Sequence, residues 1–489
     1  MKWYEIIRRF PLALFLPVQA LLLFVRLDLL PVWGDEQFTL NVIALEWGEI
    51  AGVLQADIHP PLYFYALKGW ATLWGDPGIV PARALSALVL LAATVLVDRL
   101  LLIQRGPRLR FWFLALWTLA PVLVLYGRMA RSYSLQILAA TVALHFGLKL
   151  VENPVPRRAA QFGVAMAALL YVHYLPGLAV GGAVGLFIIF RSIRRRDREL
   201  IVAGLGAGAI CLALFAPWLP TLLGGIGRAA DAEIYALTSN AFSETMLRVG
   251  YTAVSWLGGE AQSSWLLVLT LLVGVALTFG LVRNVSSLET GVKVAALAAL
   301  LGFVGAANWV SFPFMPARLL FATPALLLGC VAALRTPTLV VWLAVMAVGN
   351  VYYFQQVGFM NKGYLIPFDS IAAEIRASDV PARTLVFVDA VNADPKPLVA
   401  ALAGEVPIVQ VMDGSAESDQ MSADVRTIWH LHHSHGEFSA RLRARLGGEF
   451  SEVERGYLAY SNWERWLLVL VGRDDRPTHH YSATKWNRR

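Results

Sequence analysis

The chain contains repeated apolar runs about as long as a lipid bilayer is thick. A helix of about 17–25 mostly apolar residues can cross the hydrocarbon core. Eleven such segments are predicted, near residues 11–31, 82–103, 110–127, 132–151, 159–175, 177–190, 201–223, 263–282, 294–312, 319–334 and 339–357. Composition agrees, because 57% of the residues are hydrophobic and 15% charged, against about 25% charged in soluble domains. We expect a polytopic α-helical membrane bundle.

The basic residues between these runs favour one orientation. Cytoplasmic loops collect Lys and Arg. If the first span runs outward, all the basic clusters fall on the inner side: Arg99, Arg105, Arg108 and Arg110; Arg157 and Arg158; five arginines within 191–198; Arg283, Lys293 and Arg335. A re-entrant pair at 159–190 would reverse the later spans, and the charges argue against it. The formal charge of +7 therefore orients the chain, and nucleic acid is not an expected partner.

The chemically informative residues then fall on the outer side. The first outer loop, 32–81, carries Asp35 and Glu36, and later His59 before two prolines. Its segments 35–47 and 62–74 mix apolar, aromatic and polar residues, which is typical of helices lying in the membrane interface. Adjacent carboxylates and a histidine beside the first span indicate an enzyme acting at the membrane surface.

Three further outer segments add charge and hydrogen-bonding groups. The corner between the spans 110–127 and 132–151 carries Arg128, Arg131 and Tyr133, a later turn carries His173, and Arg318 follows a proline-rich corner. Arginines at span ends also extend to lipid headgroups without any catalytic role. The sequence leaves both interpretations open for these arginines.

The composition changes after residue 357. Strand patterns at 384–389, 407–411, 427–432 and 466–471 alternate with helix patterns at 371–376, 397–403 and 438–446. This alternation predicts two domains: a transmembrane domain, 1–357, and an extracytoplasmic α/β domain, 358–489, with a mainly parallel sheet. The run His430, His432, His433 and His435 has a spacing that metals use, but the preferred interpretation is a group of solvated histidines at a strand end.

The ordered motifs of the first 190 residues resemble a known superfamily. They are Asp35-Glu36, His59-Pro60-Pro61-Leu62-Tyr63, Ala82-Arg83-Ala84-Leu85-Ser86, Ala130-Arg131-Ser132-Tyr133 and His173-Tyr174. This set resembles the C-type (GT-C) superfamily of polyprenol-dependent glycosyltransferases, in the bacterial branch related to protein mannosyltransferases and the aminoarabinose transferase of lipid A. The chain departs from the pattern at Met129, where relatives often have Glu.

The resemblance implies a role for each motif residue. Asp35 would be the catalytic base, and its neighbour Glu36 would orient the loop. The alternative interpretation is that both carboxylates only cap the first interfacial helix. His59, Arg131, Tyr133 and His173 would bind the phosphate or sugar of the donor. Arg128 and Arg318, which lie outside the quoted motifs at the outer ends of spans, are further candidates for binding the phosphate. Transfer to a hydroxyl or amine needs a base for the acceptor's proton, and the leaving phosphate needs fixed positive charge.

The resemblance thus implies a glycosyltransferase of the bacterial plasma membrane that acts on the outer face with inversion of the anomeric centre. Its expected partners are a polyprenyl-phosphate sugar, membrane lipids, and a lipid, glycan or protein acceptor. No cofactor or metal is required, although Asp35, Glu36 and Asp57 offer oxygens for a divalent ion. The alternative is a transporter or flippase of a lipid-linked or anionic substrate. Against it, the spans show no internal repeat and their midplane is apolar.

Overall fold

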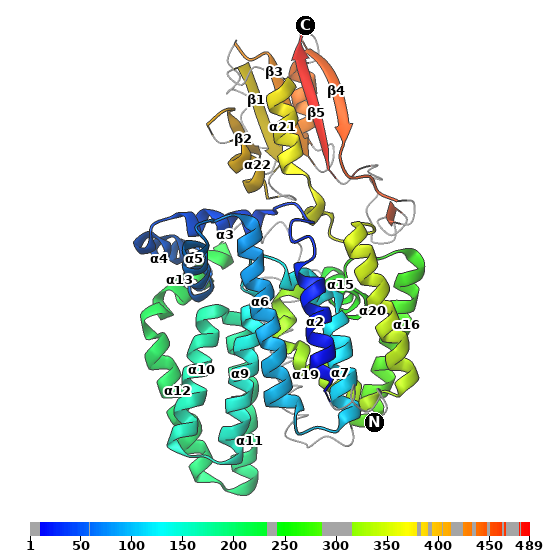
Figure 1. Ribbon diagram of the computed structural model, residues 1–489. Helices are drawn as coiled ribbons and strands as arrows, with labels where there is room; N and C mark the ends of the chain where they lie inside the picture. Colours follow the sequence, from blue (N-terminus) through cyan, green and yellow to red (C-terminus); the bar gives the residue numbers. More distant parts are fainter. Residues whose placement is uncertain are drawn as a thin grey trace. The chain divides into compact units, whose positions relative to one another are not determined.

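The computed structural model divides into two compact units (Figure 1). It describes residues 10–57, 59–231, 242–285, 315–378, 383–389, 394–402, 404–411, 424–432, 437–446, 450–461, 464–465, 479 and 481–489. The first unit comprises Met1–Leu27 and Val42–Phe359, and the second comprises Asp28–Asn41 and Met360–Arg489. The predicted first outer loop, 32–81, is thus divided between the two units.

The first unit is helical. Its main helices are α2 (Pro11–Phe24), α4 (Trp47–Ala56), α5 (Leu62–Trp74), α6 (Ile79–Val97), α7 (Pro107–Leu119), α8 (Pro121–Gly127), α9 (Tyr133–Glu152), α10 (Pro156–Val172), α11 (Tyr174–Arg195), α12 (Arg198–Phe215), α13 (Leu219–Asp231), α15 (Phe242–Gly258), α16 (Ser264–Val285), α18 (Pro316–Leu319), α19 (Thr323–Ala333) and α20 (Thr336–Gln355). Figure 1 shows α9, α10, α11 and α12 standing side by side.

The predicted spans coincide with these helices wherever the structure describes them. Among the described residues, six helical segments are long and apolar enough to cross a membrane, or seven if the bent pair α7 and α8 is one span. The chain is therefore a multi-pass membrane protein. The predicted span 294–312 lies outside the described residues, so the count of eleven stays a prediction.

A proline bends the helix that the sequence suggested as one span, 110–127. Pro121 has no amide hydrogen and disfavours helical geometry in the residue before it. Ala120 is accordingly extended, with φ −60° and ψ 109°, and α7 and α8 meet at 52°. The break removes a helical partner from the carbonyl of Leu119. Asn350 on α20 replaces that partner by donating from Nδ2 at 2.8 Å.

Three helices are joined by a buried polar chain. Thr94 on α6 donates its hydroxyl to Gln19 Oε1 on α2 at 2.7 Å, and it accepts a bond from Trp117 Nε1 on α7 at 2.8 Å. All three residues are at most 1% exposed. Hydrogen bonds of this kind hold helices together where both helix surfaces and lipid are apolar.

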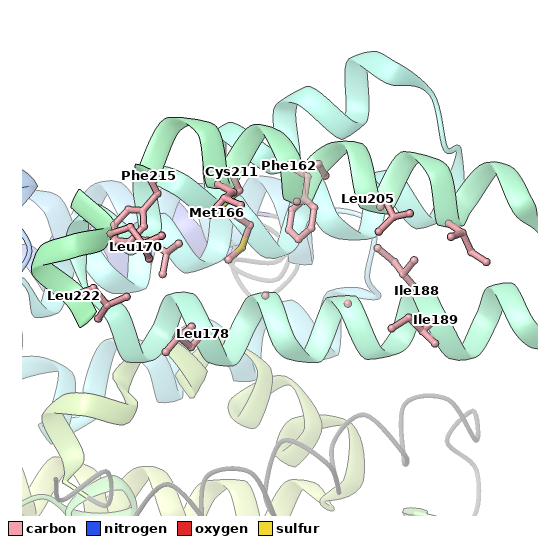
Figure 2. Close-up of a pocket in the computed structure, with 18 residues that line it drawn as sticks. Phe162, Met166, Leu170, Leu178, Ile188, Ile189, Leu205, Cys211, Phe215 and Leu222 are labelled. Atoms are coloured by element: carbon pink, nitrogen blue, oxygen red, sulfur yellow. The ribbon is translucent and has the colours of Figure 1, made fainter. Parts of the chain in front are cut away.

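Two apolar cavities open between helices of this bundle. One, of about 430 Å³, lies among α10, α11 and α12, and Figure 2 shows side chains such as Met166, Cys211 and Phe215 around it. Small residues widen it, because a Cβ at Gly185 or Gly208 would meet nothing within 4 Å. A second, of about 790 Å³, is lined mainly by α15, α16, α19 and α20. The lining of both cavities is almost entirely apolar.

The second unit contains a five-stranded sheet in the order β2-β1-β3-β5-β4. The strands are β1 (Thr384–Asp389), β2 (Ile408–Val411), β3 (Thr427–His432), β4 (Phe450–Gly456) and β5 (Ser482–Arg488), and the helices are α3 (Gly34–Ala44), whose residues up to Asn41 belong here, α21 (Phe368–Ser378), α22 (Lys396–Ala401) and α23 (Glu437–Leu446). β1 pairs with β2 and β3 in parallel, whereas β5 pairs with β3 and β4 antiparallel. The expectation of a mainly parallel sheet holds for half of these pairings. The predicted strand 466–471 lies outside the described residues.

Apolar side chains cover both faces of this sheet. On one face, Ile371 and Ile375 of α21 pack with Val386 and Trp429. On the other, Leu442 and Leu446 of α23 pack with a second apolar cluster from the same strands. This alternation along the strands follows from the two-residue period of β-structure.

The expectation of solvated histidines is wrong for His430 and His432. They are 2% and 1% exposed, because β3 lies between β1 and β5 rather than at an edge. His432 Nε2 is 2.9 Å from Thr484 Oγ1 on β5. His433 and His435 lie outside the described residues.

Candidate functional site

In the first unit, His59 and Arg131 are brought together by two linkers. His59 lies in the linker from α4 to α5, where Pro60 and Pro61 start the following helix. Arg131 Nη2 lies 2.7 Å from His59 Nε2, and His59 Nδ1 lies 2.9 Å from Asp57 Oδ1. A guanidinium can only donate, so Nε2 of His59 accepts and its Nδ1–H donates to Asp57. These two contacts fix the tautomer of His59 and the direction of the Arg131 side chain.

The backbone of Arg131 is fixed as well. Ser86 on α6 bonds to the carbonyl of Arg131 at 3.4 Å, and the hydroxyl of Tyr63 on α5 lies 3.1 Å from Ser86 Oγ. Arg131 itself is only 5% exposed. Three of the motifs singled out in the sequence, around Tyr63, Ser86 and Arg131, therefore form one connected group.

His173 and Arg318 belong to the same neighbourhood. His173 is the single residue between α10 and α11. Burial, first of all, and electrostatic interactions with Arg318, His59 and Arg131 together lower its pKa to about 3. The residue is partly exposed, but its Nδ1 atom is buried and has no hydrogen-bond partner within the described parts of the chain. Gln136 on α9 bonds to the carbonyl of Ala317 at 2.7 Å, which anchors the turn that carries Arg318.

Arg128 makes different contacts. Its guanidinium donates to the carbonyls of Leu22, at 2.8 Å, and Arg26 at the end of α2, and it lies over the rings of Tyr353 and Phe354. These bonds satisfy carbonyls that a helix end leaves open. The binding of donor phosphate by Arg128 stays a prediction.

Tyr133 is connected through Tyr126 to the buried acid Glu260. Its ring packs edge-on against Tyr126, with centroids 5.3 Å apart, and the hydroxyl of Tyr126 donates to Glu260 Oε1. Glu260 lies between α15 and α16 and is 3% exposed, so burial raises its pKa to about 7. No motif marks Glu260 in the sequence, because its partner Tyr126 is far away in the chain.

Asp35 and Glu36 lie in the second unit, in the first turn of α3. Glu36 is fully buried, whereas Asp35 is partly exposed. The hydroxyl of Thr39 bonds to the carbonyl of Asp35 at 3.0 Å, as is common for a threonine inside a helix. Acidic residues are stabilised in this position because the amino end of a helix carries partial positive charge.

A metal site built only from protein side chains is not evident. Within the described residues, no group of three or more His, Cys, Asp or Glu side chains gathers closely enough to hold an ion. Asp57, which the sequence offered as one oxygen ligand, instead bonds His59.

Comparison with solved structures identifies the fold. No protein-family model and no curated protein matches the sequence. The structure of ArnT from Cupriavidus metallidurans bound to undecaprenyl phosphate is similar over 97% of both chains, with 13% identity and a TM-score of 0.54. The archaeal oligosaccharyltransferase AglB from Archaeoglobus fulgidus, in complex with an inhibitory peptide and a dolichol-phosphate, is similar over 88% of this chain and 70% of its own, with 11% identity and a TM-score of 0.50. The resemblance inferred from the motifs is thus confirmed at the level of architecture: this chain has the fold of the GT-C glycosyltransferases.

Proposed function

We propose that this protein is a membrane glycosyltransferase that moves a sugar from a polyprenyl-phosphate donor to an acceptor hydroxyl or amine on the outer face of the plasma membrane. The observation that carries the proposal is the group formed by Arg131, His59, His173 and Arg318 within this fold. The group gathers two guanidinium ions and two imidazoles from three linkers and the short helix α18. ArnT, which has the same fold, binds undecaprenyl phosphate.

The phosphate of the donor would lie against Arg131 and Arg318. Guanidinium groups bind phosphate oxygens with paired hydrogen bonds, and a partly dehydrated setting strengthens them. His173 is neutral at physiological pH because its pKa is lowered to about 3, so its buried nitrogen accepts or donates a hydrogen bond without adding charge. His59 orients Arg131 and is itself oriented by Asp57.

The reaction would be a single displacement at the anomeric carbon. The acceptor oxygen or nitrogen forms a bond to that carbon, while the bond from the carbon to the phosphate oxygen breaks. The electron pair leaves with polyprenyl phosphate, whose developing charge the arginines stabilise. One in-line displacement inverts the anomeric configuration.

Asp35 would take the proton that the acceptor loses. It is the partly exposed member of the acidic pair, and the resemblance implies this role for it. Glu36 is fully buried and would hold the turn in place. The scheme itself calls for no metal ion.

The test is the release of free polyprenyl phosphate by the purified full chain. The protein in detergent is incubated with polyprenyl-phosphate sugars and a membrane-lipid extract as acceptor. We expect free polyprenyl phosphate to form only when donor and acceptor are both present. A transporter would leave the donor intact in this assay, and the absence of released polyprenyl phosphate would contradict the proposal.

A further inference from the structure

Within the second unit, the segment that carries Asp35 and Glu36 touches the α/β part at three places. Trp33 packs edge-on against Tyr364, with ring centroids 5.1 Å apart. Lys396 at the start of α22 lies over the ring of Phe38 at 5.9 Å. Between these two contacts, Gly34 lies directly against Asp394. The contacts thus flank the acidic pair on both sides in the sequence.

The contact at Gly34 is the tightest of the three. A Cβ atom built on Gly34 would overlap the Cβ, Cγ and Oδ2 atoms of Asp394. Asp394 cannot turn away freely, because its Oδ1 accepts from the backbone nitrogen of Lys396 at 3.1 Å and its Oδ2 pairs with Lys396 Nζ at 2.6 Å. Only glycine allows the backbone to approach this carboxylate so closely.

The helix behind this contact is short. α3 has 11 residues, and helices of this length are marginal in water unless other parts of the protein hold them. Its first turn contains both carboxylates. The direction in which Asp35 points therefore depends on what holds residues 33–38, and tertiary contacts do so here.

We propose that the C-terminal α/β part is a clamp for the acidic turn: Tyr364 and Lys396 are positioning residues that hold Asp35 and Glu36 in their working orientation through Trp33 and Phe38, and Asp394 sets how closely Gly34 can approach. This role rests on the proposed function, since it assumes that Asp35 acts as the base. It assigns a task to the described part of residues 360–489, to which the proposed reaction gives no other role.

The test introduces a steric overlap at Gly34 and a second substitution that removes this overlap, both in the full chain. Gly34→Ala forces the turn away from Asp394, and Asp394→Gly removes the atoms that an added Cβ would meet. The matched control is Gly52→Ala on α4, where a Cβ meets nothing within 4 Å. For each variant, hydrogen exchange of residues 28–41, polyprenyl phosphate affinity and turnover are measured.

We expect Gly34→Ala to speed exchange in 28–41 and to lower turnover on the order of 10²-fold, the usual effect of misplacing a reacting group by about 1 Å. Polyprenyl phosphate affinity should stay unchanged, and the double variant Gly34→Ala with Asp394→Gly should recover both exchange and turnover. Gly52→Ala should behave as wild type. If Gly34→Ala does not fold, Lys396→Met removes the cation from Phe38 and Asp394 and should speed the same exchange.

Two results would overturn the clamp. One is unchanged exchange in 28–41 in both Gly34→Ala and Lys396→Met. The other is a loss of turnover that the double variant does not recover. A wild-type chain without any transferase activity would instead refute the proposed function, while the exchange measurements would still show whether the contact holds the turn.

Discussion

At the scale of single residues, the direction of Arg131 is determined by the bonds around it. His59 accepts from its guanidinium and Asp57 fixes His59. Arg131→Lys keeps the positive charge but loses the planar pair of donors. We expect affinity for polyprenyl phosphate to fall by about 1–3 kcal/mol, the usual value of a hydrogen bond to a charged group. Direct binding to the purified protein measures this, with Arg108→Lys at the start of α7 as control. Equal affinity in Arg131→Ala would leave Arg131 without a phosphate role.

The lowered pKa of His173 predicts that the folded protein loses stability in acid. Its pKa is about 3 in the folded protein against about 6.5 in an unfolded chain. The unfolded chain therefore binds a proton below pH 6.5 that the folded chain does not, so stability falls as the pH falls from about 6.5 toward 3. Between pH 6.5 and 5 the loss is at most about 2 kcal/mol. Thermal unfolding should show a smaller decrease over this interval in His173→Asn, and an equal decrease in both proteins would exclude this origin.

At the scale of helices, the bend between α7 and α8 depends on a side chain from α20. Asn350 donates to the carbonyl of Leu119, which Pro121 deprives of its helical partner. Asn350→Leu should lower the free energy of unfolding by about 1–3 kcal/mol, because a buried carbonyl loses its bond. The neighbouring change Val351→Leu, at a position 52% exposed, serves as control. Unfolding in a denaturing detergent measures both, and equal stability would mean that Leu119 needs no such partner.

The same bend illustrates what hydrophobic runs predict. The run 110–127 was recognised as an apolar helical segment, because length and composition suffice for that, whereas its crossing of the membrane as one span stays a prediction. It did not predict that the helix breaks at Pro121, because the break is accommodated by Asn350 of α20, which bonds to the carbonyl of Leu119. Likewise, the spacing of the histidines on β3 could not show that the strand lies inside the sheet, because its neighbours in the sheet come from distant segments.

At the scale of the whole molecule, the sequence predicted the residue types of the site better than their partners. The order of motifs indicated the fold and selected His59, Arg131 and His173. It could not reveal the bond from His59 to Arg131, which joins linkers separated by helices α5 to α8. Nor could it show that residues 28–41 group with residues 360–489, because the contacts of Gly34 lie at the opposite end of the chain.

Orientation is a further prediction at this scale. The one-sided arginines predict that the α/β part is extracytoplasmic. In a chain with Cys211 and Cys330 replaced by Ala, Ala377→Cys on the exposed side of α21 should react with an impermeant thiol reagent in intact spheroplasts. Gln104→Cys, in an exposed inner loop by the same assignment, should react only after the membrane is broken. The reverse pattern would overturn the assignment of sides.

The central claim is that sugar transfer depends on a carboxylate in the first turn of α3, and the release of polyprenyl phosphate by Asp35→Asn tests it most directly. Asparagine keeps the size of the side chain and loses only the proton acceptor. We expect folding and donor affinity to stay near wild type while the rate of release falls on the order of 10²–10⁴-fold, the usual contribution of a positioned base. Glu36→Gln should be affected less. Near wild-type release by Asp35→Asn with an inactive Glu36→Gln would move the base to Glu36, and normal release by both variants would contradict the account.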